Sequence, residues 1–150
     1  MQTIEVSIMS AALQPISPLM VVPAIALVDT DARILLAQRP KNKLMGGFWE
    51  FPGGKIETEE TPEQALIREI NEELGINTKQ SCLAPVSFAS HAYDDFHLLL
   101  LLYICRRWQG RPEPREGGQL AWVKPSQLRQ YEMPPANSEF ISILQDLLFT

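Results

Sequence analysis

The sequence predicts an α/β (α+β) domain in which helices flank a mixed central β-sheet. Apolar segments rich in β-branched residues have the length of strands, and a helix with clear start and stop signals lies between them. Strand-like segments return after that helix, and further helices follow them. Strands, a helix, more strands and more helices in this order are typical of an α/β sandwich.

The part of the chain before this helix is expected to contribute three strands. Residues 20–29 are apolar and β-branched, and residues 33–39 follow a short turn as their hairpin partner. Residues 48–51 form a short aromatic strand that leads into a Pro-Gly-Gly turn.

The helix at 62–74 is the most strongly signalled element. Thr61 is a suitable N-cap, Pro62 suits the first helical position, and Gln64 completes the spacing of a capping box. Gly75 is a suitable C-terminal stop. An apolar stripe on one face predicts contact with a sheet: Leu66, Ile70 and Leu74.

The part of the chain after the helix is expected to add three strands and two short helices. The strands are expected at 83–93, 96–108 and 119–123, with Asp94-Asp95 joining the first two and a loop at 109–118 before the last. The helices are expected at 125–131 and 138–149, separated by the segment Met-Pro-Pro-Ala-Asn.

Composition and charge narrow the functional class. The formal net charge of −5 argues against nonspecific binding of nucleic acid polymers. Cys82 and Cys105 are too few for a disulfide framework and fit a reducing compartment, so we expect a cytoplasmic protein. The apolar run at 97–105 is too short to cross a bilayer as a helix, and no membrane partner is expected.

We divide the chain into residues 1–18, an N-terminal extension of uncertain order, and residues 19–150, the folded domain. The first residues lack the basic region and the long apolar core of a signal peptide. The 150 residues suffice for one domain with its own core. We expect a monomer or a weak homodimer.

Three glutamates share one face of the predicted helix. Glu69, Glu72 and Glu73 project together because they stand at positions i, i+3 and i+4. Like charges at this spacing repel unless they are solvated, which is the usual case, or unless a cation lies among them. The Gly-Gly-Lys segment at 53–55 lies before the helix, and a glycine turn beside a lysine and several carboxylates suits a metal–phosphate site.

The spacing of these residues resembles the Nudix box. The pattern reads Gly54, five residues, Glu60, seven residues, Arg68-Glu69-Ile70, one residue, Glu72-Glu73, one residue and Gly75-Ile76, so every fixed position of the box is met. Over about residues 20–149 the chain also resembles the MutT-type members of the Nudix family more loosely. This resemblance implies a Nudix-type α/β/α sandwich.

The resemblance implies a role for each matching position. Glu69, Glu72 and Glu73 would bind Mg²⁺, for which Mn²⁺ is a substitute, and the backbone carbonyl of Gly53 would join them. Arg68 would orient these glutamates through hydrogen bonds, as its i, i+4 relation to Glu72 allows.

Three glutamates outside this face have implied roles as well. Glu57 and Glu60 would hold the loop or bind an outer metal. Glu116 resembles the distant glutamate that MutT-type enzymes bring to the metal, although it also fits a solvated loop charge.

The implied reaction is the hydrolysis of a nucleoside triphosphate at its β-phosphorus, which yields a monophosphate and pyrophosphate. A carboxylate takes the proton of the attacking water, and Glu69 is the predicted base. Arg39 and Lys55 would contact the phosphates, although Arg39 also fits a surface arginine at the end of a strand.

Asn137 is the predicted reader of the base. Its segment, Met-Pro-Pro-Ala-Asn, resembles that of MutT-type enzymes which act on oxidised guanine nucleotides. Oxidation at C8 turns N7 of guanine into a donor beside O6, and an amide matches both groups. The same amide fits adenine, and Asn137 also fits a helix cap. Phe51 or Phe96 would wall the base, and Phe96 stands where the best-known MutT-type members carry an arginine.

We therefore predict a Mg²⁺-dependent pyrophosphohydrolase that converts 8-oxo-dGTP to 8-oxo-dGMP and pyrophosphate, an activity that avoids mutation during DNA replication. One alternative is the same chemistry on CTP, dCTP or an oxidised adenine nucleotide. Another is a Nudix-fold module that binds a nucleotide without hydrolysing it. The presence of all three box glutamates argues against such a module.

Overall fold

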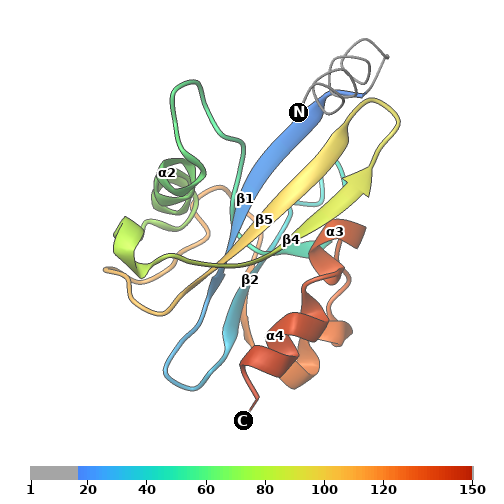
Figure 1. The fold of residues 1–150 in the computed structure, drawn as a ribbon. Coiled ribbons are helices and arrows are strands. Elements are labelled where there is room, and N and C mark those ends of the chain that lie inside the picture. The colour runs from blue at the N-terminus through green and yellow to red at the C-terminus, as the bar shows by residue number, and fades with distance from the viewer. Residues whose placement is uncertain (1–16, 150) are drawn as a thin grey trace, which may run out of the picture.

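Two three-stranded β-sheets form the centre of the molecule, and helices cover their outer faces (Figure 1). The computed structural model describes residues 17–149, so residues 1–16 of the predicted extension lie outside the described residues. The predicted α/β class with a mixed sheet is confirmed. No helix within residues 17–149 has both the length and the apolar character needed to cross a bilayer.

The first sheet is mixed and contains the longest strands. β1 (Leu19–Leu27) runs parallel to β5 (His97–Cys105), and β4 (Ala84–Ala92) pairs antiparallel with β5 at the edge. The second half of β1 is buried at every residue, as expected for a strand that is covered on both faces. All three strands lie where the sequence predicts them.

The second sheet is antiparallel. β2 (Ile34–Gln38) lies between β3 (Trp49–Glu50) and β6 (Leu120–Val123). The predicted hairpin between β1 and β2 is wrong, although the turn between them forms. A single bridge, Val28 to Ile34, joins the two segments, because β1 pairs along its whole length with the equally apolar β5.

Helix α2 (Pro62–Leu74) has the predicted bounds and ends. Thr61 and Gln64 form both bonds of the capping box, and Gly75 closes the helix in the left-handed conformation with φ 72°. The apolar stripe of α2 packs on one face of β1, in a core that contains Ile25 and Leu27. Glu73, at the far end of the acidic face, lies beside residues of β2 and β3.

The C-terminal helices cover the opposite face of the sheets (Figure 1). They comprise the 3₁₀ helix η2 (Pro125–Gln130), α3 (Pro135–Ser138) and α4 (Ile141–Leu147). The segment Met-Pro-Pro-Ala-Asn was predicted to separate two helices, yet α3 begins within it, because proline is well suited to the first helical position. A short 3₁₀ helix, η1 (Gln80–Cys82), was not predicted.

Candidate active site

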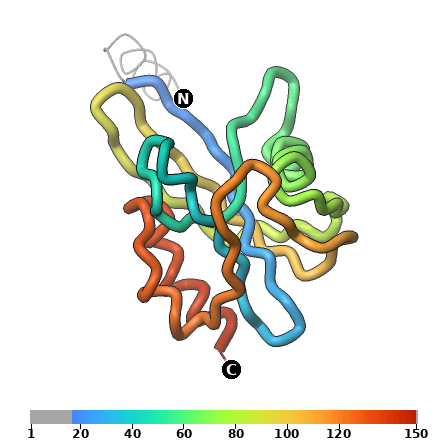
Figure 2. The backbone as a smooth tube through the Cα atoms, turned by 180° about the vertical axis from the view of Figure 1, so that it is seen from behind, coloured from blue at the N-terminus to red at the C-terminus, as the bar shows by residue number. Residues whose placement is uncertain are grey.

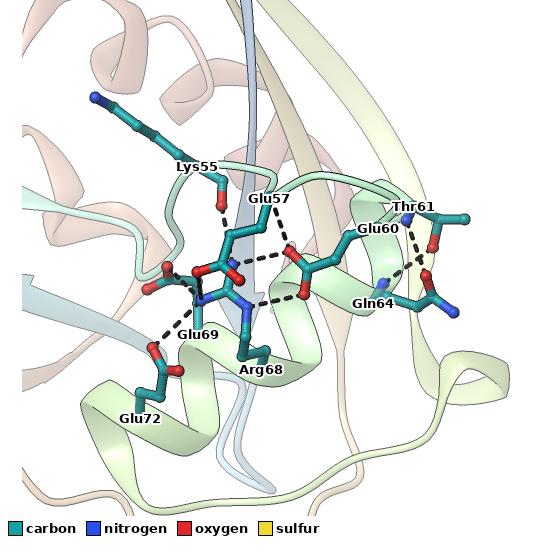
Figure 3. A network of polar contacts seen from close by, with 8 residues as sticks. All are labelled: Lys55, Glu57, Glu60, Thr61, Gln64, Arg68, Glu69 and Glu72. Carbon is teal, nitrogen blue, oxygen red and sulfur yellow. Dashed lines mark hydrogen bonds and ion pairs between the residues drawn. The ribbon is translucent and has the colours of Figure 1, made fainter.

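Arg68 is the centre of a polar network beside the first turns of α2 (Figure 3). Its Nε donates to Glu60 Oε2 at 2.8 Å and its Nη2 donates to Glu60 Oε1 at 3.0 Å, a two-point contact. Nη1 donates to Glu69 at 3.0 Å and to Glu72 at 3.3 Å. Nη2 also donates to the backbone carbonyl of Lys55 at 3.0 Å. Arg68 therefore ties the loop before α2 to the acidic face.

The loop glutamates are neutralised by this network. The hydrogen bonds from Arg68 are the main reason that the pKa of Glu60 lies below its usual value, and the Glu57 amide adds to the effect. Glu57 itself has a carboxylate oxygen 3.6 Å from Nη1 of Arg68. These contacts correspond to the loop-holding role, one of the two roles predicted for Glu57 and Glu60.

Two glycines allow the loop to approach its neighbours closely. A side chain at Gly54 would place its Cβ 2.6 Å from Oε1 and 2.7 Å from Oε2 of Glu69, so only glycine leaves that carboxylate where it is. Gly53 forms an antiparallel bridge with Ala24 of β1 and lies directly against Pro23. The loop is thereby fixed between the sheet and the acidic face.

Several carboxyl groups crowd together at the far end of the acidic face. Burial is the main reason that the pKa of Glu73 rises to about 8, and the like charges of Glu69, Glu116 and Glu50 raise it further. The Gly53 amide opposes this shift. Burial also raises the pKa of Glu69, against the effect of Arg68. Carboxylates from β3, α2 and the β5–β6 loop thus disfavour one another's ionised form.

A cavity of about 150 Å³ opens at this end of the face. Glu73 and Glu116 line it together with Arg39, Lys43 and Glu50. Arg39 is bound to Glu50, since its Nη1 donates to Glu50 Oε1 at 3.2 Å. Cationic and anionic side chains around one small cavity suit a complex of phosphate and metal.

A second cavity, of about 290 Å³, adjoins the first, because Arg39, Glu50 and Glu73 line both. Of the residues predicted to contact the substrate, all but Phe96 line this second cavity: Arg39, Phe51, Lys55 and Asn137. Apolar side chains of β1 and β5, such as Val22 and Leu98, form much of the remaining wall. A ligand with a flat ring and a polyphosphate would therefore fit across the two cavities.

Asn137 is 7% exposed, and its side chain has a defined orientation. Its Oδ1 accepts a hydrogen bond from the backbone N–H of Phe51 at 3.1 Å. The interpretation of Asn137 as a helix cap is wrong, since the residue lies inside α3, whose N-cap is Pro134. The Phe51 ring is 3% exposed and packs edge-on against Phe140, so it belongs mainly to the core.

Among the residues that line the second cavity but were not predicted, two have polar side chains, Glu50 and Tyr93. Tyr93 stacks on Phe96 with 4.8 Å between ring centroids, and Phe96 is not among the lining residues. Tyr93 therefore occupies the place predicted for Phe96. A charged residue inside a short aromatic strand was the available signal for Glu50.

The predicted metal ligands do not form a ready-made cage. Within residues 17–149, no three acidic, histidine or cysteine side chains converge closely enough to hold a metal ion. Arg68 binds two of the predicted ligands, and the remaining carboxylates face the first cavity. The donors are all oxygens, and crowded like charges are relieved by a cation, so the chemistry fits Mg²⁺. The ligand set stays a prediction: Gly53, Glu69, Glu72, Glu73 and Glu116.

Comparison with known proteins identifies the family of this chain. A family model described as the NUDIX domain matches residues 24–142. The chain belongs to the Nudix family. This match confirms the recognition of the Nudix box in the sequence. Nudix hydrolases generally depend on a divalent metal and act on small nucleotides.

Several Nudix proteins are similar to this chain over most of its length. An Escherichia coli (strain K12) protein named 8-oxo-dGTP diphosphatase is 37% identical over 79% of this chain and 91% of its own length. A CTP pyrophosphohydrolase from the same organism is 36% identical over 75% of this chain and 82% of its own length. The solution structure of the E. coli ORF135 protein matches with a TM-score of 0.78 at 31% identity, covering 89% of this chain and 95% of that one.

Proposed function

We propose that this Nudix hydrolase cleaves 8-oxo-dGTP to 8-oxo-dGMP and pyrophosphate, with Mg²⁺ as its metal. The observation that carries the proposal is the orientation of the Asn137 amide, which the Phe51 N–H holds inside the cavity that Lys55 and Glu73 also line. The similarity to an 8-oxo-dGTP diphosphatase supports it. Removal of this oxidised precursor protects DNA from mutation during replication.

The amide discriminates between guanine and its oxidised form. Oxidised guanine has an N–H at N7 beside the O6 acceptor, and Asn137 offers Oδ1 to the first and Nδ2 to the second. A carbonyl oxygen has two lone pairs, so the bond from Phe51 leaves one of them for the base. Unmodified guanine would place the lone pair of N7 against Oδ1, and the mismatch would leave buried polar groups unpaired.

The Phe51–Asn137 bond also argues against adenine. In the same ring position, adenine has a donor at N6 and an acceptor at N7, which is the reverse of the pattern in oxidised guanine. Adenine would therefore require a rotated amide. That rotation would bring Nδ2 of Asn137 against the N–H of Phe51, and two donors would face each other.

The first cavity, together with the part of the second that Lys55 and Glu73 line, would receive the triphosphate. Lys55 and Arg39 would contact phosphate oxygens, and the acidic face would supply oxygen ligands to the metal. When bound, the metal neutralises phosphate charge and lowers the pKa of a bound water. The proposed ligands and catalytic groups are those of the sequence prediction: Glu69, Glu72, Glu73, Glu116, Gly53 and Arg68.

Glu69 is the proposed base. Arg68 holds its carboxylate by a hydrogen bond of 3.0 Å, and Gly54 leaves room for it. Burial raises the pKa of Glu69, which makes its carboxylate a stronger acceptor for the proton of the attacking water. Arg68 thus acts by keeping that oxygen in a fixed position.

The test is a panel of nucleotides with the wild type and Asn137→Ala. We expect kcat/KM for 8-oxo-dGTP to exceed that for dGTP by at least about 100-fold, and the ratio to fall toward unity in Asn137→Ala. Asn77→Ala is a matched control, because Asn77 is exposed and does not line the second cavity. An unchanged ratio in Asn137→Ala would refute the proposed base recognition.

A second candidate substrate is CTP, which is favoured by the similarity to a CTP pyrophosphohydrolase. The same panel distinguishes the two, since a CTP hydrolase would give its highest kcat/KM with CTP or dCTP. We also propose a cytoplasmic location and a monomeric or weakly dimeric state. The free thiols of Cys82 and Cys105 support the location, and gel filtration tests the oligomeric state.

A further inference from the structure

We propose that Arg115 is a positioning residue that holds Glu116 beside Glu73 by docking the β5–β6 loop onto the last turn of α2. The inference rests on the proposed function, in which Glu116 is a metal ligand. It adds a residue outside the Nudix box and outside the predicted ligand set.

The backbone of the loop provides the first contact. The N–H of Arg115 donates to the carbonyl of Glu73 at 2.9 Å, and the N–H of Glu113 donates to the carbonyl of Leu74 at 2.9 Å. The last carbonyls of a helix have no partner within the helix, so this loop completes the C-terminal end of α2. Figure 2 shows the loop, in orange, running beside α2.

The Arg115 side chain provides the second contact. A Cβ at Gly75 would lie 2.5 Å from Nε and 2.6 Å from Nη2 of Arg115, so the guanidinium packs directly on this glycine. A cation is favourable at the C-terminal end of a helix, where the exposed carbonyls carry partial negative charge. Gly75 therefore has two reasons to be glycine, its φ of 72° and the space that Arg115 occupies.

The start of the loop is anchored separately. The N–H groups of Gln109 and Asn77 each donate to the carbonyl of the other residue, at 2.7 Å and 3.0 Å. Asn77 follows α2 closely, so both this anchor and the Arg115 contact hold the loop to the same end of the helix.

Glu116 is the next residue after Arg115, and its position follows from this docking. Glu116 and Glu73 line the same cavity, although they come from distant parts of the sequence. The backbone of Arg115 is bound to Glu73 itself, so the two carboxylates are set relative to each other by one hydrogen bond and one guanidinium contact. Loss of the guanidinium would give Glu116 several positions, and a metal ligand with several positions binds weakly.

The experiment measures Mn²⁺ binding to the full-length protein by electron paramagnetic resonance, without nucleotide. We expect Arg115→Ala to raise the Kd by about tenfold, as for other residues that orient a metal ligand, and Arg115→Lys to recover part of the loss. Arg111→Ala is the matched control, because Arg111 is, like Arg115, an exposed arginine of this loop, whereas only Arg115 has its guanidinium against Gly75. We expect its Kd to equal that of the wild type.

A double-mutant cycle tests whether Arg115 acts through Glu116. In the Glu116→Gln background, Arg115→Ala should weaken Mn²⁺ binding no further, since the residue it positions has lost its charge. An equal loss in both backgrounds, or no loss in either, would overturn the proposal. Hydrogen exchange gives a readout independent of metal, because the amides of Glu113 and Arg115 should exchange faster in Arg115→Ala while those of β5 remain protected.

Turnover separates this inference from the proposed function. In Arg115→Ala, excess metal should restore kcat, and the KM for nucleotide should change little. If the double-mutant cycle shows the coupling in Mn²⁺ binding but the wild type hydrolyses no triphosphate, the proposed function is refuted and the positioning role remains supported. If the wild type hydrolyses 8-oxo-dGTP but the double-mutant cycle shows no coupling, only the role of Arg115 is refuted.

Discussion

The loop before α2 and the far end of the acidic face of α2 carry the same kind of side chain in opposite electrostatic settings. In the loop just before α2, Glu60 accepts two hydrogen bonds from Arg68, and its pKa is lowered. Near the end of the helix, Glu73 is half-buried near like charges, and its pKa rises to about 8. Glu60, which is neutralised within the chain, holds the loop, whereas Glu73 marks a place where an external cation would be stabilising.

The largest effect that tests this comparison is expected for Glu73→Gln. If Glu73 is a metal ligand as proposed, its loss removes several kcal/mol of charge stabilisation, so we expect kcat/KM to fall by about 1000-fold. The metal-free protein should unfold at the same temperature or higher, because a neutral amide replaces a crowded carboxylate. Steady-state kinetics and calorimetry measure both quantities. Full activity in Glu73→Gln would indicate that the metal binds elsewhere. Glu139→Gln is the control, because Glu139 is exposed on the surface.

The next largest effect is expected for Arg68→Ala, at the neutralised end. Its loss leaves Glu60 and Glu69 without their main partner, and we expect about 2 kcal/mol less stability, between the values for exposed and buried ion pairs. Urea unfolding without metal measures this loss. Arg33→Ala breaks the more exposed pair with Asp29 and should cost less than about 1 kcal/mol. Equal losses of stability in Arg68→Ala and Arg33→Ala would contradict the conclusion that Arg68 ties the loop to the acidic face.

The smallest effect is a pH dependence of the metal-free protein. The folded-state pKa of Glu73, about 8, lies above its unfolded value of 4.5, so this group favours folding fully below pH 4.5 and loses that contribution as the pH rises through 8. We therefore expect the wild type to lose more stability between pH 6 and pH 9 than Glu73→Gln does. Mg²⁺ should reduce the difference. If the unfolding temperatures of the two proteins changed with pH in the same way, the raised pKa of Glu73 would be contradicted.

Sequence signals predicted the ends of a helix more successfully than they predicted which distant strands pair. The bounds of α2 follow from Thr61, Gln64 and Gly75, which act on backbone groups within a few residues. The partner of β1 depends on competition between distant strands, and the adjacent β2 was chosen wrongly over β5. Proximity along the chain favours a hairpin, but the burial of two long apolar strands against each other outweighs it.

The candidate site shows the same limit. The spacing of the Nudix box led directly to the residues around Arg68, because one helix and its preceding loop carry them all. Glu50 and Tyr93 come from other elements, and only the folded chain brings them to the cavity with Asn137. The docking of Arg115 on Gly75 was also missed, since it joins a loop to a helix through contacts that leave no periodic pattern.

The bond between Phe51 and Asn137 links residues 86 positions apart through a main-chain donor. Every amino acid except proline supplies that N–H, so substitutions at position 51 can alter the core without removing the group that orients the amide. Selectivity for the base would then tolerate substitutions of Phe51, whereas replacement of Asn137 would abolish it. In a protein whose proposed task is to limit mutation, one of the two groups that form this hydrogen bond is therefore insensitive to most substitutions of its own residue.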